Sequence, residues 1–237
     1  MKNLPNIVTC LNLYSGCLAC VMALVYNNYT GAFLFIFLAA CFDFLDGFVA
    51  RLLKAYSPLG AQLDSLADVV SFGLAPGFIV YSFLSTASVS VPYSTNIKLL
   101  AFLIPIFAAL RLAKFNIDSR QKSSFLGLPV PANGLFWATL IPSIPLLNGN
   151  HIFYTFFVIG FIIIFCLLMV SELPMFSLKF THYKWNGNEY PYIMILIALL
   201  LIVFFHLLGI CLSIILYIFL SLTKYVMGLK EVEKSKR

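Results

Sequence analysis

Eight apolar stretches follow one another along the chain, with polar segments between them. Each is close to the roughly 20 residues that a helix needs to cross the hydrocarbon layer of a bilayer. Backbone amides in lipid need internal partners, and the stretches are too long and alternate too weakly for barrel strands, so the pattern predicts helices. The predicted spans are 5–27, 30–53, 60–86, 96–117, 130–147, 151–171, 191–206 and 208–227.

The last two spans belong to one apolar run, residues 191–226. As a single helix this run would be about 54 Å long, because each residue adds about 1.5 Å, and it would extend far beyond the bilayer. We therefore expect a turn near residues 206–209. The chain as a whole is predicted to be an all-α, polytopic membrane bundle of about eight transmembrane helices in a single domain, residues 1–237.

Composition supports an integral membrane protein. Hydrophobic residues make up 62% of the chain and charged residues 10%, whereas soluble domains have about 45–50% and about 25%. The first span follows a lone Lys2 and lacks a convincing small-residue cleavage site, so we expect it to be retained. The six cysteines lack metal-ligand spacing and are expected to be small apolar fillers.

The basic residues predict an orientation. If the N-terminus is cytoplasmic and there are eight spans, Lys98 is the one exception among the 15 lysines and arginines, and all others lie on the inner side. We therefore expect a multi-pass protein of the cell membrane with both termini in the cytoplasm. The formal charge of +6 is interpreted as this asymmetry beside membrane lipids. It is not interpreted as a nucleic-acid footprint, because no basic stripe with interleaved aromatic residues is present.

Four aspartates interrupt this apolar pattern within "DFLDGFVARLLKAYSPLGAQLDSLAD", residues 43–68. The second and third spans are joined by residues 52–59, and the Ser57-Pro58 pair favours a turn, so they form an antiparallel hairpin. Counted from the ends of the two spans, Asp46 and Asp64 lie about 6–7.5 Å inward and Asp43 and Asp68 about 12 Å. Spacings of three and four residues place each pair on one helix face. The four carboxylates are therefore predicted to share one site near the cytoplasmic surface.

Divalent cations are the expected partners of these acids. A buried aspartate at the centre of a span costs about 2.5–3.5 kcal/mol on insertion scales, and only Arg51 and Lys54 lie close in sequence. The alternative without a metal is a buried ion-pair network that bridges the helices. Hard carboxylate oxygens without cysteine or histidine favour Mg²⁺ or Mn²⁺. Two such ions typically assist displacement at phosphorus. The chain has no Walker lysine loop, no dinucleotide-binding glycine motif and no paired-histidine zinc motif, so nucleotide hydrolysis, hydride transfer and zinc proteolysis have no support.

The segment resembles the signature of the CDP-alcohol phosphatidyltransferase family: an aspartate pair, a glycine, an Ala-Arg, a glycine and a second aspartate pair. The resemblance implies that Asp43, Asp46, Asp64 and Asp68 hold two divalent cations, and that Asp68 is also the base for the attacking hydroxyl. It further implies a homodimer. The same resemblance assigns the cytidine diphosphate pocket to Gly47, Ala50, Arg51 and Gly60.

Four further stretches resemble the phosphatidylserine synthase branch of that family: "PNIVTCLNLYSG" at 5–16, "LDSLADVVSFGLAPG" at 63–77, "LRLAKFN" at 110–116 and "FLGLPVPA" at 125–132. Glycerophosphate-using relatives usually carry an arginine where this chain has Asn12. The resemblance implies that the phosphatidyl group of CDP-diacylglycerol passes to L-serine, giving phosphatidylserine and CMP at a site facing the cytoplasm. Sister enzymes that use glycerol 3-phosphate or inositol remain an alternative. A cation transporter is another, because intramembrane carboxylates also mark ion pathways.

Secondary candidates lie near the same predicted surface. Asn6 and Thr9, near the start of the first span, are candidates for contact with the CDP-diacylglycerol nucleotide, although polar residues also settle at the interface. Arg111 or Asn116 is the candidate for the serine carboxylate or a lipid phosphate, because an arginine fork suits either oxyanion. Positive-inside anchoring is the ordinary alternative for Arg111 and Lys114. The stretch 127–131 predicts an extended approach to the fifth span.

Overall fold

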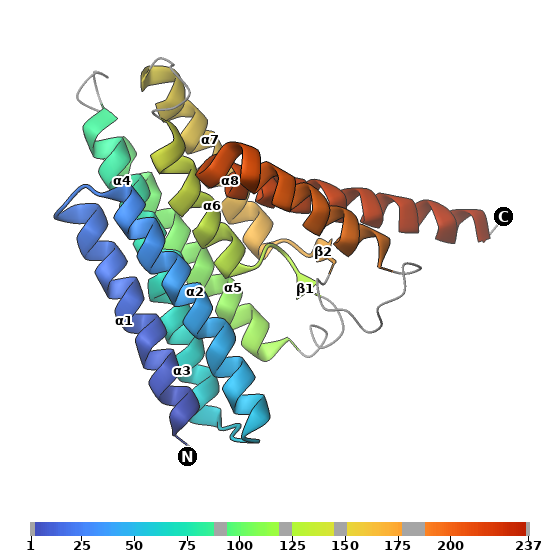
Figure 1. Ribbon diagram of the computed structural model, residues 1–237. Helices are drawn as coiled ribbons and strands as arrows, with labels where there is room; N and C mark the ends of the chain where they lie inside the picture. Colours follow the sequence, from blue (N-terminus) through green and yellow to red (C-terminus); the bar gives the residue numbers. More distant parts are fainter. Residues whose placement is uncertain (1–2, 88–93, 119–124, 145–150, 177–187, 236–237) are drawn as a thin grey trace.

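The computed structural model describes residues 3–87, 94–118, 125–144, 151–176 and 188–235, and helices dominate it (Figure 1). The helices are α1 (Leu4–Leu24), α2 (Tyr29–Leu52), α3 (Pro58–Asp68), α4 (Ala75–Ala87), α5 (Leu103–Ile117), α6 (Val130–Ser143), α7 (His151–Val170) and α8 (Glu189–Ser235). A π-helical segment, η1 (Val69–Leu74), joins α3 to α4, and a 3₁₀ segment, η3 (Ser94–Phe102), precedes α5. Two short strands, β1 (Phe125–Leu126) and β2 (Pro174–Met175), pair antiparallel.

The predicted membrane bundle is confirmed in its class. Six helical stretches in the described part of the chain are long and apolar enough to cross a membrane: Leu4–Leu24, Tyr29–Leu52, Pro58–Thr86, Asn96–Ile117, Ile152–Val170 and Glu189–Met227. The predicted fifth span corresponds to α6, whose described 14 residues are shorter than a span. The last two predicted spans form one long stretch by this measure. The number of eight therefore stays a prediction.

The predicted turn in the last apolar run is confirmed. His206 has φ 50° and ψ −120°, which interrupts α8 and divides it into two legs. The Tyr190 hydroxyl lies 3.5 Å from the sulfur of Met227, so the legs run antiparallel. Figure 1 shows that this hairpin crosses the direction of α1 and α2, where the sequence predicted two further spans of a common bundle.

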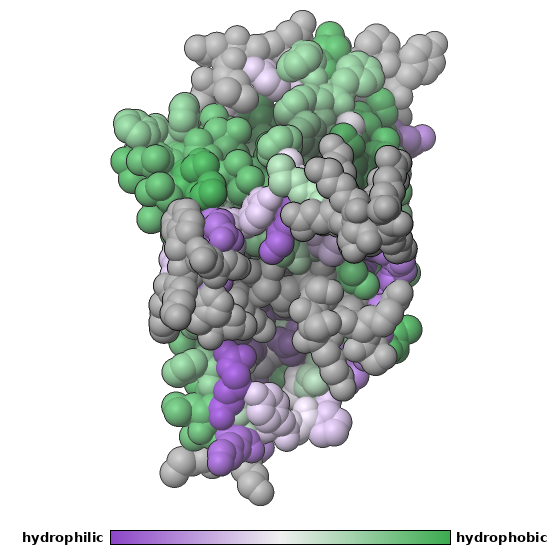
Figure 2. Space-filling view, turned by 90° about the vertical axis from the view of Figure 1, so that its right-hand side faces the viewer, coloured by the Kyte–Doolittle hydropathy of each residue, from purple (hydrophilic) through white to green (hydrophobic). Residues whose placement is uncertain are grey.

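Local sequence explains the hairpin that carries the aspartates. Pro58 occupies the first turn of α3, and the Ser57 hydroxyl accepts a hydrogen bond of 3.0 Å from the Gly60 amide, as expected of an N-cap. The predicted Ser57-Pro58 turn is therefore correct. Hydrophilic residues gather in the lower half of the face shown in Figure 2, the half toward which α2 and α3 are joined in Figure 1.

Close helix contacts hold η1 at the centre of the bundle. A side chain at Gly134 of α6 would place its Cβ 2.9 Å from the Cα of Phe72, and one at Gly73 would meet the Cβ of Ala108 at 3.0 Å. Fully buried aromatic rings of α6 and α7 also stack, with 3.9 Å between the ring centroids of Phe136 and Phe165. The segment that follows Asp68 is thus fixed between α5 and α6.

The approach to α6 is extended, as the sequence predicted. Pro129 has φ −61° and ψ 138°. Gly127 has φ 73°, and its amide donates to the Leu173 carbonyl at 2.9 Å while the Leu128 amide donates to the Leu168 carbonyl at 3.0 Å. A Cβ at Gly127 would lie 2.6 Å from the Met169 carbonyl oxygen, so both the backbone angle and the space require glycine.

Candidate active site

Three of the four predicted aspartates come together between α2 and α3. One carboxylate oxygen from each of Asp43, Asp64 and Asp68 lies within 4.8 Å of the other two. Asp68 is buried and the other two are partly buried. We call Asp43, Asp64 and Asp68 the acidic cluster. It depends on the antiparallel hairpin, because residues of α2 and α3 that lie at similar depth face each other.

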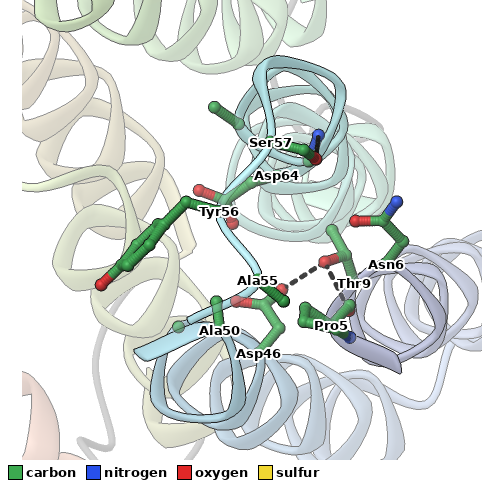
Figure 3. A pocket seen from close by; sticks show the side chains of 12 residues that line it. Pro5, Asn6, Thr9, Asp46, Ala50, Ala55, Tyr56, Ser57 and Asp64 are labelled. Atoms are coloured by element: carbon green, nitrogen blue, oxygen red, sulfur yellow. Dashed lines mark hydrogen bonds between the residues drawn. The ribbon is translucent and has the colours of Figure 1, made fainter. Parts of the chain in front are cut away.

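Asp46 has a different environment. Its Oδ2 accepts a hydrogen bond of 2.6 Å from the Thr9 hydroxyl of α1, and the same hydroxyl lies 3.0 Å from the Pro5 carbonyl oxygen. Figure 3 shows the Asp46 carboxylate turned toward Thr9 in the wall of a pocket that Asp64 also lines. The predicted depth pairing is therefore only approximate: Asp64 joins Asp43 and Asp68, and it also lines the pocket together with Asp46.

This pocket is formed by α1, α2, α3 and the turn between α2 and α3 (Figure 3). It encloses about 570 Å³, including open solvent at its mouth. Five of the six predicted CDP-diacylglycerol residues line it, namely Asn6, Thr9, Gly47, Ala50 and Gly60. The lining also includes Asp46 and Asp64, together with five residues outside the predicted set: Pro5, Ala55, Tyr56, Ser57 and Ala61.

Small residues keep the pocket open. A Cβ at Gly60 would lie 3.0 Å from the Asn6 Oδ1 and 3.1 Å from the Ser57 hydroxyl, so glycine lets α1 approach the start of α3. The N-terminal end of α3 lies at this border and carries the positive end of the helix dipole, while the Gly60 and Ala61 amides are already bonded to Ser57. The pocket thus combines free space with partial positive charge, next to the acidic cluster.

Arg51 lies outside the set of residues that line this pocket. It is exposed at the C-terminal end of α2, and its Nη1 lies 3.6 Å from the position that a Cβ on Gly47 would occupy. The side chain is therefore beside the pocket, on the solvent side of Gly47.

Asn12 of α1 contacts the acidic cluster directly, which the sequence analysis did not predict. Its Nδ2 donates to the Asp68 Oδ1 at 3.2 Å, and its side chain is fully buried. The spacing of Thr9 and Asn12 offered a signal, because residues three apart share one helix face and both contact signature aspartates.

Arg111 of α5 is a buried basic residue with the features of an anion-binding group. It is 6% exposed, and its Nε and Nη2 have no hydrogen-bond partner among the described residues. Its guanidinium carbon lies 5.1 Å from the ring centroid of Phe115 and is within electrostatic range of Asp68 and Tyr217. Because unpaired buried donors are costly, this side chain is suited to an anion.

Asn116 and Lys114 make contacts between helices. The Asn116 amide donates to the Ser65 hydroxyl of α3 at 2.9 Å, at an exposed position. The Lys114 ammonium donates to the Val170 carbonyl at 3.3 Å and lies 3.7 Å from Glu172. Asn116 therefore joins α5 to α3, and Lys114 joins α5 to the end of α7.

The acidic cluster fits a hard divalent cation. All three groups offer oxygen ligands, and the buried Asp64 Oδ1 has no hydrogen-bond partner in the described part of the chain. Over the same residues, no lysine or arginine lies within ion-pair distance of any of the four aspartates. A buried ion-pair network, the alternative to a metal site, is therefore not supported in the described part of the chain.

Comparison with known proteins gives a consistent result. A family model described as CDP-alcohol phosphatidyltransferase matches residues 2–180, so α8 begins beyond the match. A CDP-diacylglycerol–serine O-phosphatidyltransferase of Bacillus subtilis (strain 168) is 35% identical over 189 residues, which are 80% of this chain and 96% of that protein.

Two further relatives extend the comparison. The enzyme of the same name from Helicobacter pylori (strain J99) is 32% identical over 204 residues, covering 84% of this chain and 81% of that protein. An archaetidylserine synthase of Methanothermobacter thermautotrophicus is 38% identical over 130 residues, covering 54% of this chain and 53% of that protein.

Proposed function

The chain belongs to the CDP-alcohol phosphatidyltransferase family, and we propose that it transfers the phosphatidyl group of CDP-diacylglycerol to the hydroxyl of L-serine, giving phosphatidylserine and CMP. The observation that carries this proposal is the position of the acidic cluster beside an open pocket, with Asp64 common to both. The names of the bacterial relatives support serine as the acceptor.

The pocket would hold the cytidine diphosphate part of the lipid substrate. Gly47, Ala50 and Gly60 leave room for phosphate oxygens, and the positive end of the α3 dipole favours negative charge. Asn6 and Thr9 line the opposite wall on α1 and would contact the nucleotide. Arg51, outside Gly47, would reach the diphosphate from the solvent side.

We assign Asp43, Asp46, Asp64 and Asp68 as ligands of two divalent cations, Mg²⁺ or Mn²⁺. When bound, these ions neutralise the diphosphate and stabilise the attacking and leaving oxygens of a displacement at phosphorus. The carboxylate oxygens supply the hard ligands that both metals prefer. Asp46 would join the other three from the pocket side, where it now accepts a hydrogen bond from Thr9.

Asp68 is assigned as the general base. The serine hydroxyl oxygen forms a bond to the phosphorus on the diacylglycerol side, the bond from that phosphorus to the CMP oxygen breaks, and the serine proton passes to the Asp68 carboxylate. A carboxylate within reach of the hydroxyl is suited to this role. Asp68 is 7% exposed, so little water competes for it.

Arg111 is assigned to the serine carboxylate or a lipid phosphate. It is buried, it has two nitrogens without partners among the described residues, and it lies within electrostatic range of the proposed base. Asn116 was proposed for the same anion. Its hydrogen bond to Ser65 instead supports a role in holding α5 against α3, and so in keeping Arg111 near Asp68.

The same proposal includes the topology. The eight spans that the sequence predicts would place the termini and the acidic cluster at the cytoplasmic surface and leave Lys98 outside. This topology requires both legs of α8 to span the membrane, whereas the hairpin in Figure 1 crosses the direction of α1 and α2. CDP-diacylglycerol would enter laterally from the inner leaflet, where a lipid phosphate lies at the depth of the cluster. A homodimer is part of this proposal, as the family resemblance implies.

The test is CMP release by the purified protein with CDP-diacylglycerol, Mn²⁺ or Mg²⁺, and one alcohol at a time. We expect release with L-serine, none with glycerol 3-phosphate or inositol, and none after addition of a chelator. Release with either of the other alcohols alone would reassign the acceptor. Metal uptake into sealed vesicles without CMP release would instead indicate a cation transporter.

A further inference from the structure

Asn12 is held rigidly at the contact between α1 and η1. The Ser71 hydroxyl of η1 donates to the Asn12 backbone carbonyl at 3.1 Å. One turn further along α1, a Cβ at Gly16 would lie 2.8 Å from the Cα of Ser71, so the two backbones are in direct contact. The fully buried Asn12 side chain therefore has little freedom to change its position.

Asn12 contacts both sides of the point at which the helix type changes. Asp68 is the last residue of α3, and the π-helical turn begins at Val69. The Asn12 Nδ2 donates to Asp68, while the Asn12 carbonyl accepts from Ser71. Single π-helical turns within α-helices are rare and occur often at functional sites. The direction of the Asp68 side chain is thus fixed by α1 as well as by its own helix.

The amide of Asn12 is poorly explained by stability alone. Its Oδ1 is buried and has no hydrogen-bond partner in the described part of the chain. An unpaired buried acceptor destabilises the fold, whereas a leucine, of similar size, would carry no polar atom into this position. The Asn12 side chain makes its hydrogen bond through Nδ2, which donates to one oxygen of Asp68.

We propose that Asn12 is a positioning residue: by donating from Nδ2 to the Asp68 Oδ1, it fixes the Asp68 carboxylate in the orientation that brings it together with Asp43 and Asp64. This inference rests on the proposed function, because it concerns the base and metal ligand assigned above. It predicts that loss of the donor slows the chemical step and weakens the response to metal, while the fold is maintained.

The test compares two substitutions of similar size, Asn12→Leu and Asn12→Asp. For Asn12→Leu we expect kcat to fall by about 10- to 100-fold, the range typical for residues that orient metal ligands, with KM for both substrates nearly unchanged. The unfolding temperature in chelator should stay equal or rise, and the upward shift produced by Mn²⁺ alone should become smaller. Asn12→Asp, which replaces the donor by an acceptor, should lower kcat at least as much.

A structural role for Asn12 predicts a different outcome. It predicts a lower unfolding temperature for Asn12→Leu without a specific loss of kcat or of the Mn²⁺ shift. Full activity of Asn12→Asp would likewise overturn the proposal, because the donor would then be dispensable. The matched control is Ser15→Ala, since Ser15 is also buried on α1 but donates to the Leu11 carbonyl of its own helix at 2.8 Å. An equal loss in this control would attribute the effect to α1 packing.

Failure of the proposed function gives a separate signature. If the wild-type protein releases CMP only with another alcohol, the serine assignment is wrong, and the Asn12 variants are compared with that alcohol. The Mn²⁺ shift of the unfolding temperature requires no acceptor at all. An unchanged Mn²⁺ shift and unchanged kcat in Asn12→Leu would overturn the inference whatever the acceptor.

Discussion

Both ends of the bundle carry polar side chains, but their hydrogen bonding differs. At the end where α1 and α2 are joined, the Ser82 hydroxyl donates to the Asn27 Oδ1 at 2.8 Å and lies 3.2 Å from the Tyr29 hydroxyl, so these three groups satisfy one another. At the end where α2 and α3 are joined, the Asn12 Oδ1, the Asp64 Oδ1 and two nitrogens of Arg111 have no partner among the described residues.

This difference separates polar groups that serve the fold from groups that serve a ligand. Each unpaired buried group costs about 1–3 kcal/mol, so a set of them gathered in one place requires a compensating partner in the working state. Substitutions at the α2–α3 end should therefore lower activity without lowering stability. Substitutions at the α1–α2 end should do the reverse.

The largest effect is expected from Asp68→Asn. Because a general base typically contributes about 10²–10⁴-fold, and because Asp68 is also an assigned metal ligand, CMP release should fall by about 10³-fold or more. The unfolding temperature in chelator should stay equal or rise, since one negative charge leaves a cluster of three. Both quantities are measured on the same purified sample.

Binding of CDP-diacylglycerol provides the control for this variant. The pocket residues of α1 and of the α2–α3 turn remain in place, so nucleotide-lipid binding should be largely retained. Retained turnover in Asp68→Asn would remove Asp68 from the role of base. A strongly lowered unfolding temperature would show that the carboxylate serves the fold, and the comparison of the two ends would fail.

A smaller effect is expected from Arg111→Met. A hydrogen bond to a charged group contributes about 1.5–3 kcal/mol, so KM for serine should rise by about 10- to 100-fold if Arg111 holds the serine carboxylate. Stability should be maintained, because methionine has no unpaired nitrogens to bury. The measurement is the serine dependence of CMP release.

Lys114→Met is the matched control on the same helix. Lys114 is partly exposed and its ion pair with Glu172 spans 3.7 Å, and such surface pairs contribute about 0–1 kcal/mol. We expect its KM for serine to stay near the wild-type value. Equal shifts in the two variants would indicate a general effect of positive charge and would remove Arg111 from the serine pocket.

The sequence was sufficient for the features that depend on one helix or on one hairpin. Hydrophobic length predicted the helical stretches, the excessive length of the last run predicted the turn at His206, and Ser57-Pro58 predicted the start of α3. The spacing of the aspartates predicted the convergence of Asp43, Asp64 and Asp68. Each of these follows from the period and rise of a regular helix.

Features that depend on a third helix were not predictable in the same way. The separation of Asp46 from the acidic cluster follows from its hydrogen bond to Thr9, and the contact of Asn12 with Asp68 follows from the close approach of α1 at Gly16. The π-helical turn after Asp68 departs from the regular period on which depth counting relies. The crossing direction of α8 depends on its packing against α6 and β2, which hydropathy does not specify.

The smallest effect on activity, and a clear effect on stability, is expected from Ser82→Ala. Ser82 is 6% exposed and takes part in both hydrogen bonds of its group, so its loss leaves Asn27 and Tyr29 without this partner. The free energy of unfolding should fall by about 1–2 kcal/mol, while kcat, both KM values and the Mn²⁺ shift stay unchanged. Tyr29→Phe removes only one of the two bonds and should cost less. A fall in kcat for Ser82→Ala without a fall in unfolding temperature would mean that the α1–α2 end takes part in turnover. The presence or absence of hydrogen-bond partners would then no longer separate the polar groups that stabilise the fold from those that serve activity.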